Sequence, residues 1–321
     1  MEAYLGIDVG SVTTKLAVLD SNDQLIAYTY LLTQGKPIDM VQQGLAQVRR
    51  QLPKDVEICG AATTGSARYL AGVIIGADLV KNEITSHATA ALSYFPEVQT
   101  VIEIGGQDSK IIIIRDSVVV DFGMNTVCAA GTGSFLDHQA LRLNMSIEEL
   151  SRRAQDSQTP VRIAGRCTVF AESDMVHKQQ MGHRTEDILY GLCQALVRNY
   201  LNNVALGKEI KPPIIFQGGV AFNRAIVKAF EDELKAEVVV PPHHEVMGAI
   251  GAALLTHEEM MSNRNASLFK GFGVSEVKYH TSSFECKACP NLCEIAQLSL
   301  NGKVLARWGG RCDMWERSPA T

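Results

Sequence analysis

Cysteine is the residue type in this sequence with the greatest capacity for metal or redox chemistry, and the chain has eight of them. Four lie near the C-terminus with the spacing C-x2-C-x3-C-x18-C, namely Cys286, Cys289, Cys293 and Cys312. Pro290 and the glycine pair before Cys312 suit the tight turns of a ligand loop. Four thiolates from one chain can hold a tetrahedral zinc ion or a [4Fe–4S] cluster, so the spacing predicts a metal site of one of these kinds.

A second cysteine pair, Cys128 and Cys167, stands immediately before turns that enter helical sequence, in MNTVCAAGTGSFLD and AGRCTVFAESDMVH. A thiolate is stabilised at the N-terminus of a helix, where backbone N–H groups favour negative charge. Isolated cysteines are more often buried structural residues, and we expect this of Cys59 and Cys193 in their apolar surroundings. In a reducing compartment, clustered cysteines bind metal more often than they form disulfides.

Two glycine-containing turns lie between apolar strands: LGIDVGSVTTKLAVLD at residues 5–20 and VIEIGGQDSKIIIIRD at residues 101–116. They share a register, because Asp8 precedes Lys15 by the same seven residues that separate Glu103 from Lys110. A third apolar strand follows each of them. The repetition predicts a duplicated strand–turn–strand unit that opens each half of a two-lobed molecule.

These turns, and a third at residues 214–223 (IIFQGGVAFN), have the composition of a phosphate site. Without Cβ atoms, glycine N–H groups can approach an anion closely; the glycines are Gly10, Gly105, Gly106, Gly218 and Gly219. Neighbouring side chains that add donors or charge are Ser11, Thr13, Thr14, Lys15, Asp108, Lys110 and Asn223. Strand-end carboxylates suit a hydrated Mg²⁺, so we expect Asp8 and Glu103, with Gln107, in catalytic positions.

The sequence around these residues alternates between strand and helix patterns. Apolar residues recur at helical spacing in residues 37–52, and again from about residue 133 to 153. A helix at 224–235, a strand EVVVPP and a small-residue helix MGAIGAALL follow the third turn. The pattern predicts α/β lobes with mixed sheets. We expect one lobe at 1–96, a second at 97–268 whose chain returns to the first near 250–268, and a four-cysteine module at 269–321.

Composition excludes several classes of partner. The chain is 46% hydrophobic and 20% charged, which is typical of a globular protein, and its net charge is −5. Without a basic stripe, neither nucleic acid nor an anionic membrane is expected as a main partner. No apolar run reaches transmembrane length, and the N-terminus enters a strand without a signal peptide. We therefore expect a cytoplasmic protein.

The three turns resemble those of the superfamily of acetate and sugar kinases, Hsp70 chaperones and actin, in which two lobes close around ATP. LGIDVGSVTTK is similar to the first phosphate loop, VIEIGGQDSK to the second, and IIFQGGVAFN to the adenosine motif. NEITSHATAAL and MGAIGAAL match the two connecting segments, so the likeness spans roughly residues 4–256. It implies two ribonuclease-H-like α/β lobes. Glu103 departs from the pattern, because an aspartate is usual at this position.

Glu83, at the start of NEITSHATAAL, has two interpretations. It is either a solvated carboxylate on a helix or, as the resemblance implies, a residue that orients or deprotonates the attacking water. Phosphoryl transfer depends mainly on positioning and electrostatics, so no strong base is required.

The segments around Cys128 and Cys167, together with GGQDSK, closely resemble the activators (component A) of the 2-hydroxyacyl-CoA dehydratases, in the BadF/BadG/BcrA/BcrD ATPase family. The resemblance implies an ATPase that drives low-potential electron transfer. It implies that both cysteines from each of two subunits hold one [4Fe–4S] cluster, since a cubane takes four thiolates. It also implies ferredoxin or flavodoxin as donor and an iron–sulfur acceptor, either a 2-hydroxyacyl-CoA dehydratase or a double-cubane-type reductase.

Two other functions remain open from the sequence. An ATP-dependent small-molecule kinase of the same fold, such as an amino-sugar kinase, explains the phosphate turns but gives Cys128 and Cys167 no purpose. A nucleotide-dependent scaffold or sensor with zinc-binding cysteines is the third reading. The cysteine-rich tail is absent from short activators, so the substrate of those systems does not carry over to this chain.

Overall fold

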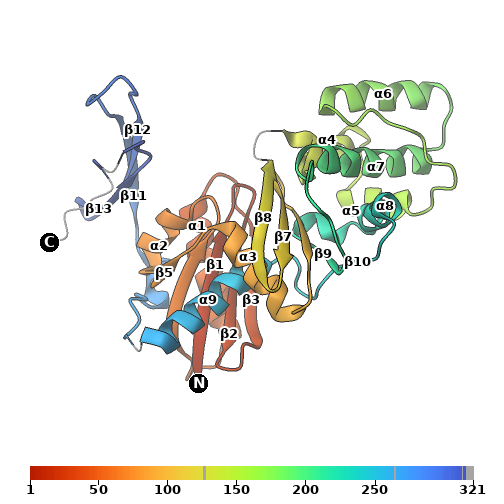
Figure 1. The fold of residues 1–321 in the computed structure, drawn as a ribbon. Coiled ribbons are helices and arrows are strands. Elements are labelled where there is room, and N and C mark those ends of the chain that lie inside the picture. The colour runs from red at the N-terminus through yellow and green to blue at the C-terminus, as the bar shows by residue number, and fades with distance from the viewer. Residues whose placement is uncertain (126–127, 264, 313, 316–321) are drawn as a thin grey trace.

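The computed structural model describes residues 1–321 except 126–127, 264, 313 and 316–321. Two α/β lobes lie side by side, and a small antiparallel sheet extends from the first lobe (Figure 1). The end of the predicted cysteine module therefore lies outside the described residues.

The first lobe is built on a five-stranded sheet with the order β3-β2-β1-β4-β5. Its strands are β1 (Glu2–Val9), β2 (Thr13–Asp20), β3 (Leu25–Leu32), β4 (Glu57–Thr64) and β5 (Leu79–Val80). Helices α1 (Pro37–Gln51) and α2 (Arg68–Ile75) pack on it. Strands β1 and β2 pair antiparallel with Asp8 opposite Lys15, whereas β1 and β4 are parallel.

The second lobe repeats this plan in the order β10-β9-β6-β7-β8. Its strands are β6 (Thr100–Ile104), β7 (Ser109–Arg115), β8 (Val118–Asn125), β9 (Ile214–Gln217) and β10 (Val238–Val239). Glu103 lies opposite Lys110 on antiparallel strands, as Asp8 lies opposite Lys15 in the first lobe. The predicted duplication of the strand–turn–strand unit is confirmed.

Two helices fill the space between the sheets, namely α3 (Glu83–Tyr94) and α9 (Met247–Asn263). Helix α9 packs on the first sheet so closely that a Cβ on Gly6 would collide with the Ala249 backbone. Helix α3 covers the second sheet, where Ala88 and Ala91 join a buried cluster with Ile215. The layers therefore run sheet, α9, α3, sheet, and the two lobes meet where these helices cross.

The outer face of the second lobe is helical. Its elements are η1 (Ala129–Gly131), α4 (Gly133–Arg142), α5 (Ile147–Ala154), α6 (Thr168–Gln180), α7 (Thr185–Asn203), η2 (Gly219–Phe222) and α8 (Arg224–Leu234). The single helix expected from about 133 to 153 is two helices. Asn144 breaks it with a φ of 52°, a conformation that asparagine tolerates, and Ser146 caps α5 by accepting from the Glu149 N–H.

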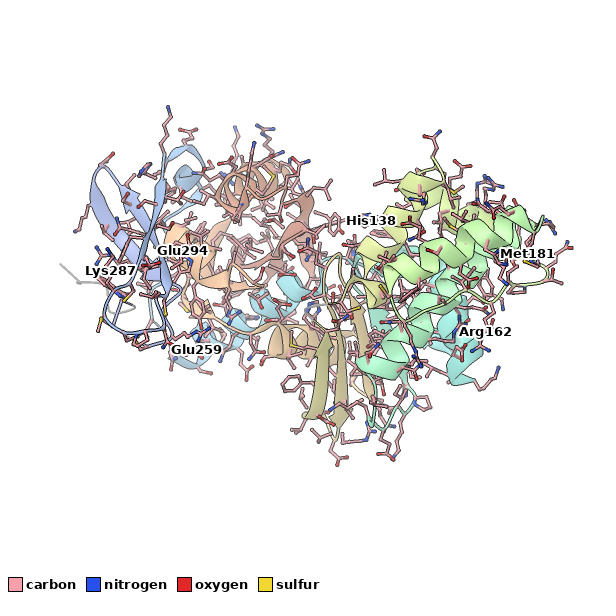
Figure 2. All side chains as sticks on the ribbon, turned by 90° about the horizontal axis from the view of Figure 1, so that it is seen from above. His138, Arg162, Met181, Glu259, Lys287 and Glu294 are labelled. Atoms are coloured by element: carbon pink, nitrogen blue, oxygen red, sulfur yellow. The ribbon has the colours of Figure 1, made fainter. Side chains whose placement is uncertain are left out.

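The C-terminal module contains η3 (Phe272–Glu276) and an antiparallel sheet of β11 (His280–Glu285), β12 (Glu294–Leu300) and β13 (Lys303–Trp308). Leu298 joins the core of the first lobe, and Gln42 of α1 donates to the carbonyls of Val274 and Val277, each at 2.7 Å. The module lies at the end of the molecule opposite α6, as the positions of Lys287 and Met181 show (Figure 2).

Within the described ranges, no helix is both long and apolar enough to cross a membrane.

Candidate functional site

The first two glycine turns face each other across the boundary between the lobes. Each is closed by one backbone hydrogen bond, from Gly10 N to Thr13 O at 2.9 Å and from Gly105 N to Asp108 O at 3.0 Å. A Cβ on Gly106 would lie 2.7–2.8 Å from the carbons of the Val12 side chain. Glycine is therefore required at this position for the two turns to meet.

The first turn places a buried ion pair at its base. The Lys15 ammonium donates to Oδ2 of Asp8 at 3.0 Å, and Asp8 is 3% exposed. Burial alone would raise the pKa of Asp8, but the charge and hydrogen bond of Lys15, together with the neighbouring His87 and Lys110, hold this pKa below its ordinary value. Asp8 is therefore ionised at neutral pH.

The second turn has one lysine surrounded by three carboxylates. The Lys110 Nζ lies 2.7 Å from Glu83, 3.0 Å from Glu103 and 2.7 Å from Asp108. Burial opposes the charge of Lys110, but the three carboxylates raise its pKa well above the ordinary value. Burial also raises the pKa of Glu83 and of Glu103. Glu83 thus belongs to the carboxylate cluster around Lys110 and does not lie on a solvated helix face. Carboxylate oxygens are ligands of the type that Mg²⁺ prefers.

The other residues predicted around these turns differ in where they point. Thr13 lines the cavity between the lobes, whereas Thr14 is fully buried and its hydroxyl lies 2.9 Å from that of Thr33. Ser11 and Gln107 are exposed at the tips of their turns. The structure therefore brings Thr13 to the cavity and directs Thr14 into the first lobe.

The third turn lies beside the second. Gly218 has a φ of 92°, and its N–H donates to the carbonyl of His244 at 2.8 Å. Asn223 caps α8 through Oδ1, which accepts from Ala225 N and Ile226 N, while its buried Nδ2 has no partner among the described residues. Part of the Asn223 side chain is thus used for the fold, and the residue also lines the cavity.

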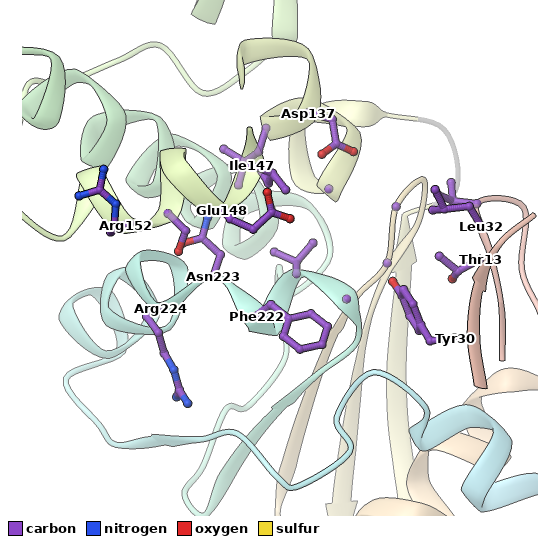
Figure 3. Close-up of a pocket in the computed structure, with 18 of the residues that line it drawn as sticks. Thr13, Tyr30, Leu32, Asp137, Ile147, Glu148, Arg152, Phe222, Asn223 and Arg224 are labelled. Atoms are coloured by element: carbon purple, nitrogen blue, oxygen red, sulfur yellow. The ribbon is translucent and has the colours of Figure 1, made fainter. Parts of the chain in front are cut away.

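A cavity of about 790 Å³ extends from these turns into the second lobe (Figure 3). Its lining includes Gly105, Gly106 and Gly219 of the glycine turns and, from the first lobe, Thr13 and Tyr30. Apolar and charged side chains of the second lobe complete it: Leu136, Ile147, Phe222, Asp137, Glu148, Arg152 and Arg224. Glycine turns beside apolar side chains are the usual composition of a pocket for a small phosphorylated ligand.

Two buried polar residues near the carboxylates were not identified from the sequence. His87 of α3 and Gln217 of β9 are 5% and 0% exposed, and His87 Nδ1 lies 2.8 Å from Gln217 Nε2. Burial, and next the charge of Lys110, lower the pKa of His87 to about 4, so the ring is neutral. The sequence held one indication of this role: His87 comes four residues after Glu83, so the two side chains lie on the same side of a helix.

The loops that carry Cys128 and Cys167 have exposed and half-buried thiols, respectively. Cys128 precedes η1, and its backbone exchanges two hydrogen bonds with the Asn125 side chain, at 2.9 and 2.7 Å. Cys167 stands at the N-cap of α6. The Asn199 side chain of α7 donates to Gly165, two residues before Cys167, at 2.6 Å.

Both cysteine loops rest on the same stretch of α7. A Cβ on Gly131 would lie 2.9 Å from Asn199 Oδ1, and one on Gly165 would lie 2.7 Å from the Ala195 carbonyl. The fold therefore gathers Cys128 and Cys167 on one part of the second lobe. Two thiols are half of the donor set of a [4Fe–4S] cluster, so they fit such a cluster only when shared with a second copy.

The four C-terminal cysteines lie on the hairpin between β11 and β12 and just after β13. Cys286 N donates to Cys293 O at 2.8 Å, and Cys286 Sγ accepts from the Trp315 indole N–H at 3.1 Å. Within the described part of the chain, no three His, Cys, Asp or Glu side chains are grouped so as to hold a metal ion. Of the two cysteines expected to be buried, Cys193 is, whereas Cys59 is only half-buried.

Comparison with known proteins gives concordant matches. The model of the BadF/BadG/BcrA/BcrD ATPase family matches residues 5–256. The (R)-2-hydroxyglutaryl-CoA dehydratase activating ATPase of Acidaminococcus fermentans is 33% identical over 260 residues, which is 79% of this chain and 97% of that protein. The crystal structure of component A of that dehydratase superposes with a TM-score of 0.74 at 31% identity and covers 81% of this chain and 100% of its own.

The activator of the 2-hydroxyisocaproyl-CoA dehydratase from Clostridium difficile, solved with bound ADPNP, superposes with a TM-score of 0.73 at 29% identity. It covers 82% of this chain and 97% of its own. The matches confirm the predicted two-lobed α/β fold. The matched family region ends at residue 256, before the C-terminal module.

Proposed function

This chain belongs to the BadF/BadG/BcrA/BcrD ATPase family, and on that premise we propose that it couples ATP hydrolysis to delivery of a low-potential electron to a partner iron–sulfur enzyme. The partner is a 2-hydroxyacyl-CoA dehydratase or a double-cubane-type reductase, and ferredoxin or flavodoxin supplies the electron. The observation that carries the proposal is a set of hydrogen bonds that joins the second glycine turn to the loop of Cys128. Because we expect the first two glycine turns to bind phosphate, we call them the phosphate turns.

ATP would occupy the cavity with its phosphates at Gly10, Gly105, Gly106 and the third turn, and its nucleoside toward Ile147 and Phe222. Asp8 and Glu103 are the residues that would hold Mg²⁺, which supplies charge neutralisation on the phosphates. Glu83 would orient the attacking water, and its raised pKa suits proton transfer. The site thereby provides positioning and electrostatics, which are the main requirements of phosphoryl transfer.

The first connection from nucleotide to cysteine runs through the start of α4. The Gly133 N–H donates to Gly105 O at 2.9 Å, and the Ser134 N–H donates to Gly106 O at 2.8 Å. The Ser134 hydroxyl also donates to Gly106 O, at 2.5 Å. Cys128 lies five residues before Gly133. A shift of the phosphate turn would therefore move the base of the Cys128 loop.

The second connection runs through α7. The Tyr200 hydroxyl donates to the carbonyl of Lys110 at 2.7 Å, and its neighbour Asn199 donates to Gly165 of the Cys167 loop. Tyr200 is fully buried, so the helix cannot shift independently of the strand that carries Lys110. The carboxylate cluster and Cys167 are thus attached to adjacent residues of one helix.

The cluster itself would be shared between two copies of the chain. Cys128 and Cys167 provide two thiolates per chain, and a two-fold axis supplies the other two. When bound, the cluster supplies the electron. The protein's part is to set the exposure and hydrogen bonding of its cysteine loops, which tune the potential of such a group.

ATP can drive this change only by binding the electron-delivering arrangement of the lobes more tightly than the resting one. The two phosphate turns come from different lobes, so a nucleotide held by both favours the closed arrangement. Hydrolysis removes that preference and lets the lobes return.

The proposal is tested with anaerobically purified, dithionite-reduced protein, to which MgATP, MgADP or nothing is added. We expect MgATP to change the electron paramagnetic resonance signal of the cluster and to accelerate chelation of its iron by bathophenanthroline. Identical spectra and chelation rates in all three samples would contradict the proposed coupling between nucleotide binding and the cluster.

One observation favours a kinase as the second candidate. A cavity of about 810 Å³ opens on the other side of Glu83, between α3 and β8, and could hold a phosphoryl acceptor beside this carboxylate. One preparation distinguishes the two candidate functions, because a colourless protein that phosphorylates an amino sugar would be the kinase.

A further inference from the structure

His87 lies where the two helices between the lobes cross. It is on α3, one turn after Glu83, and a Cβ on Gly251 of α9 would collide with the backbone of the neighbouring Ser86. At 5% exposure, the imidazole has little access to water. Its two ring nitrogens must therefore find their partners within the protein.

The Nδ1 atom faces the second lobe. The Gln217 amide nitrogen lies 2.8 Å from it and can only donate, so Nδ1 accepts and the proton of the neutral ring is on Nε2. Gln217 has 0% exposure and is opposite Glu103 on paired strands. Gln217 also immediately precedes Gly218, so it anchors the start of the third glycine turn, which we call the nucleotide turn.

The Nε2 atom faces the first lobe. A Cβ on Gly248 would lie 3.1 Å from His87 Nε2 and 2.6 Å from Asp8 Oδ2, so the ring and the carboxylate flank the same point. The charged groups around the ring are Lys110, Asp8, Glu83 and Lys15. The N–H of Nε2 and the Asp8 carboxylate thus border the same point of α9.

We propose that His87 is a positioning residue for ATP hydrolysis, which holds the nucleotide turn, through Gln217, in register with Asp8 and Glu83. Asp8 lies in the first lobe and the nucleotide turn in the second, so closure of the lobes must align the two within a few tenths of an ångström. Separating His87 from Gln217 leaves two polar groups buried without partners, and protein interiors strongly resist this. The inference rests on the ATP hydrolysis of the proposed function and adds the residues that align its parts.

Three variants separate this link from a merely structural role. His87→Gln carries its amide near Nε2 and leaves Gln217 only the backbone carbonyl of residue 87, at 3.5 Å, as an acceptor, whereas His87→Asn keeps an acceptor near Nδ1. Gln217→Met removes the donor with little change in volume. MgADP affinity, ATP turnover and melting temperature are measured for each, and for the double variant His87→Gln/Gln217→Met.

We expect His87→Gln and Gln217→Met each to weaken MgADP binding and slow turnover about tenfold, the size expected for a lost buried hydrogen bond. His87→Asn should recover MgADP affinity to within about threefold, and the double variant should be no worse than either single one. Unchanged affinity and turnover with a lower melting temperature, or effects that multiply in the double variant, would overturn the inference. A wild-type protein that binds MgADP without hydrolysing ATP contradicts the proposed function instead, and the MgADP measurements still decide the role of His87.

Discussion

The nucleotide cleft and the two cysteine loops differ in how much of their chemistry one chain supplies. In the cleft, Asp8 is paired with Lys15, and Lys110 with three carboxylates, all within the chain. At the loops, Cys128 and Cys167 present two exposed or half-buried thiols, half of what a cubane requires. One chain therefore supplies all the charged partners of the cleft, whereas under the proposed function it supplies only half of the thiolates that a cluster needs.

The comparison indicates that binding of nucleotide and binding of cluster can be lost separately, although the two regions are mechanically joined. Hydrogen bonds connect the two regions: the start of α4 donates to the second phosphate turn, and Tyr200 of α7 donates to the Lys110 carbonyl. A mutation within either region should leave the other folded.

In a background in which Cys286 and Cys289 are replaced by serine, replacing Cys128 by serine should abolish the electron paramagnetic resonance signal of the reduced cluster, because the shared site loses two of its four ligands per dimer. MgADP affinity, measured by calorimetry, should stay within about twofold, since the phosphate turns are intact. Cys59→Ser, a half-buried cysteine in the first lobe, is the matched control and should keep the signal. A full signal in Cys128→Ser would mean that this thiol is no ligand.

Replacing Asp8 by asparagine should slow ATP turnover about a hundredfold to a thousandfold, the usual cost of removing one electrostatic group from such a site. Lys15 would lose its counter-charge and Mg²⁺ one of its expected ligands. The cluster signal should not change. Asp20→Asn, at the far end of the same hairpin, is the control, and equal turnover in both variants would remove Asp8 from the mechanism.

Replacing Lys110 by methionine should lower the free energy of unfolding by about 3–5 kcal/mol in the absence of Mg²⁺, because three carboxylates then face one another without a cation. Added Mg²⁺ should stabilise this variant more than the wild type in urea titrations. Lys208→Met, which removes a surface ion pair with Asp121, should cost less than about 1 kcal/mol. Equal losses in the two variants would contradict the carboxylate cluster.

Replacing Asp187 by asparagine should destabilise the second lobe by about 1–3 kcal/mol, because this buried carboxylate accepts from Ser157, Gln158 and Thr159 upstream of Cys167. Burial alone would raise the pKa of Asp187, but these hydrogen bonds lower it to about 2. Its stabilisation is therefore complete above the ordinary value of 3.8 and lost as pH falls through about 2.

Urea titrations at several pH values measure this contribution. The asparagine variant should lack the part of the pH dependence that belongs to this group. A variant whose stability follows the wild type at every pH would show that the carboxylate does not anchor the loop.

The parts of the fold that could be predicted from the sequence are those set by short-range contacts. The units around Asp8 and Glu103 are hairpins whose strands pair with their neighbours in the chain, so spacing alone revealed them. The single helix expected across Asn144 was wrong, because helical periodicity continues through a residue that adopts a left-handed conformation.

The parts that could not be predicted depend on contacts between distant elements. Gln217 reaches His87 across 130 residues of sequence, and neither stands in a recognisable pattern with the other. Lys110 was predicted to bind phosphate, but its pairing with Glu83 exists only because α3 packs on the second sheet. Cys128 and Cys167 were paired by resemblance, and only the fold shows that α7 supports both loops.

The proposed function requires a cluster shared by two copies of the chain through Cys128 and Cys167. Its most direct test is iron and sulfide analysis, with native mass determination, of an anaerobic preparation in which Cys286 and Cys289 are replaced by serine to disable the C-terminal site. We expect a dimer with about two irons and two sulfides per chain, all lost when Cys128→Ser is added. A monomer with about four irons per chain, or iron that survives loss of Cys128, would contradict it.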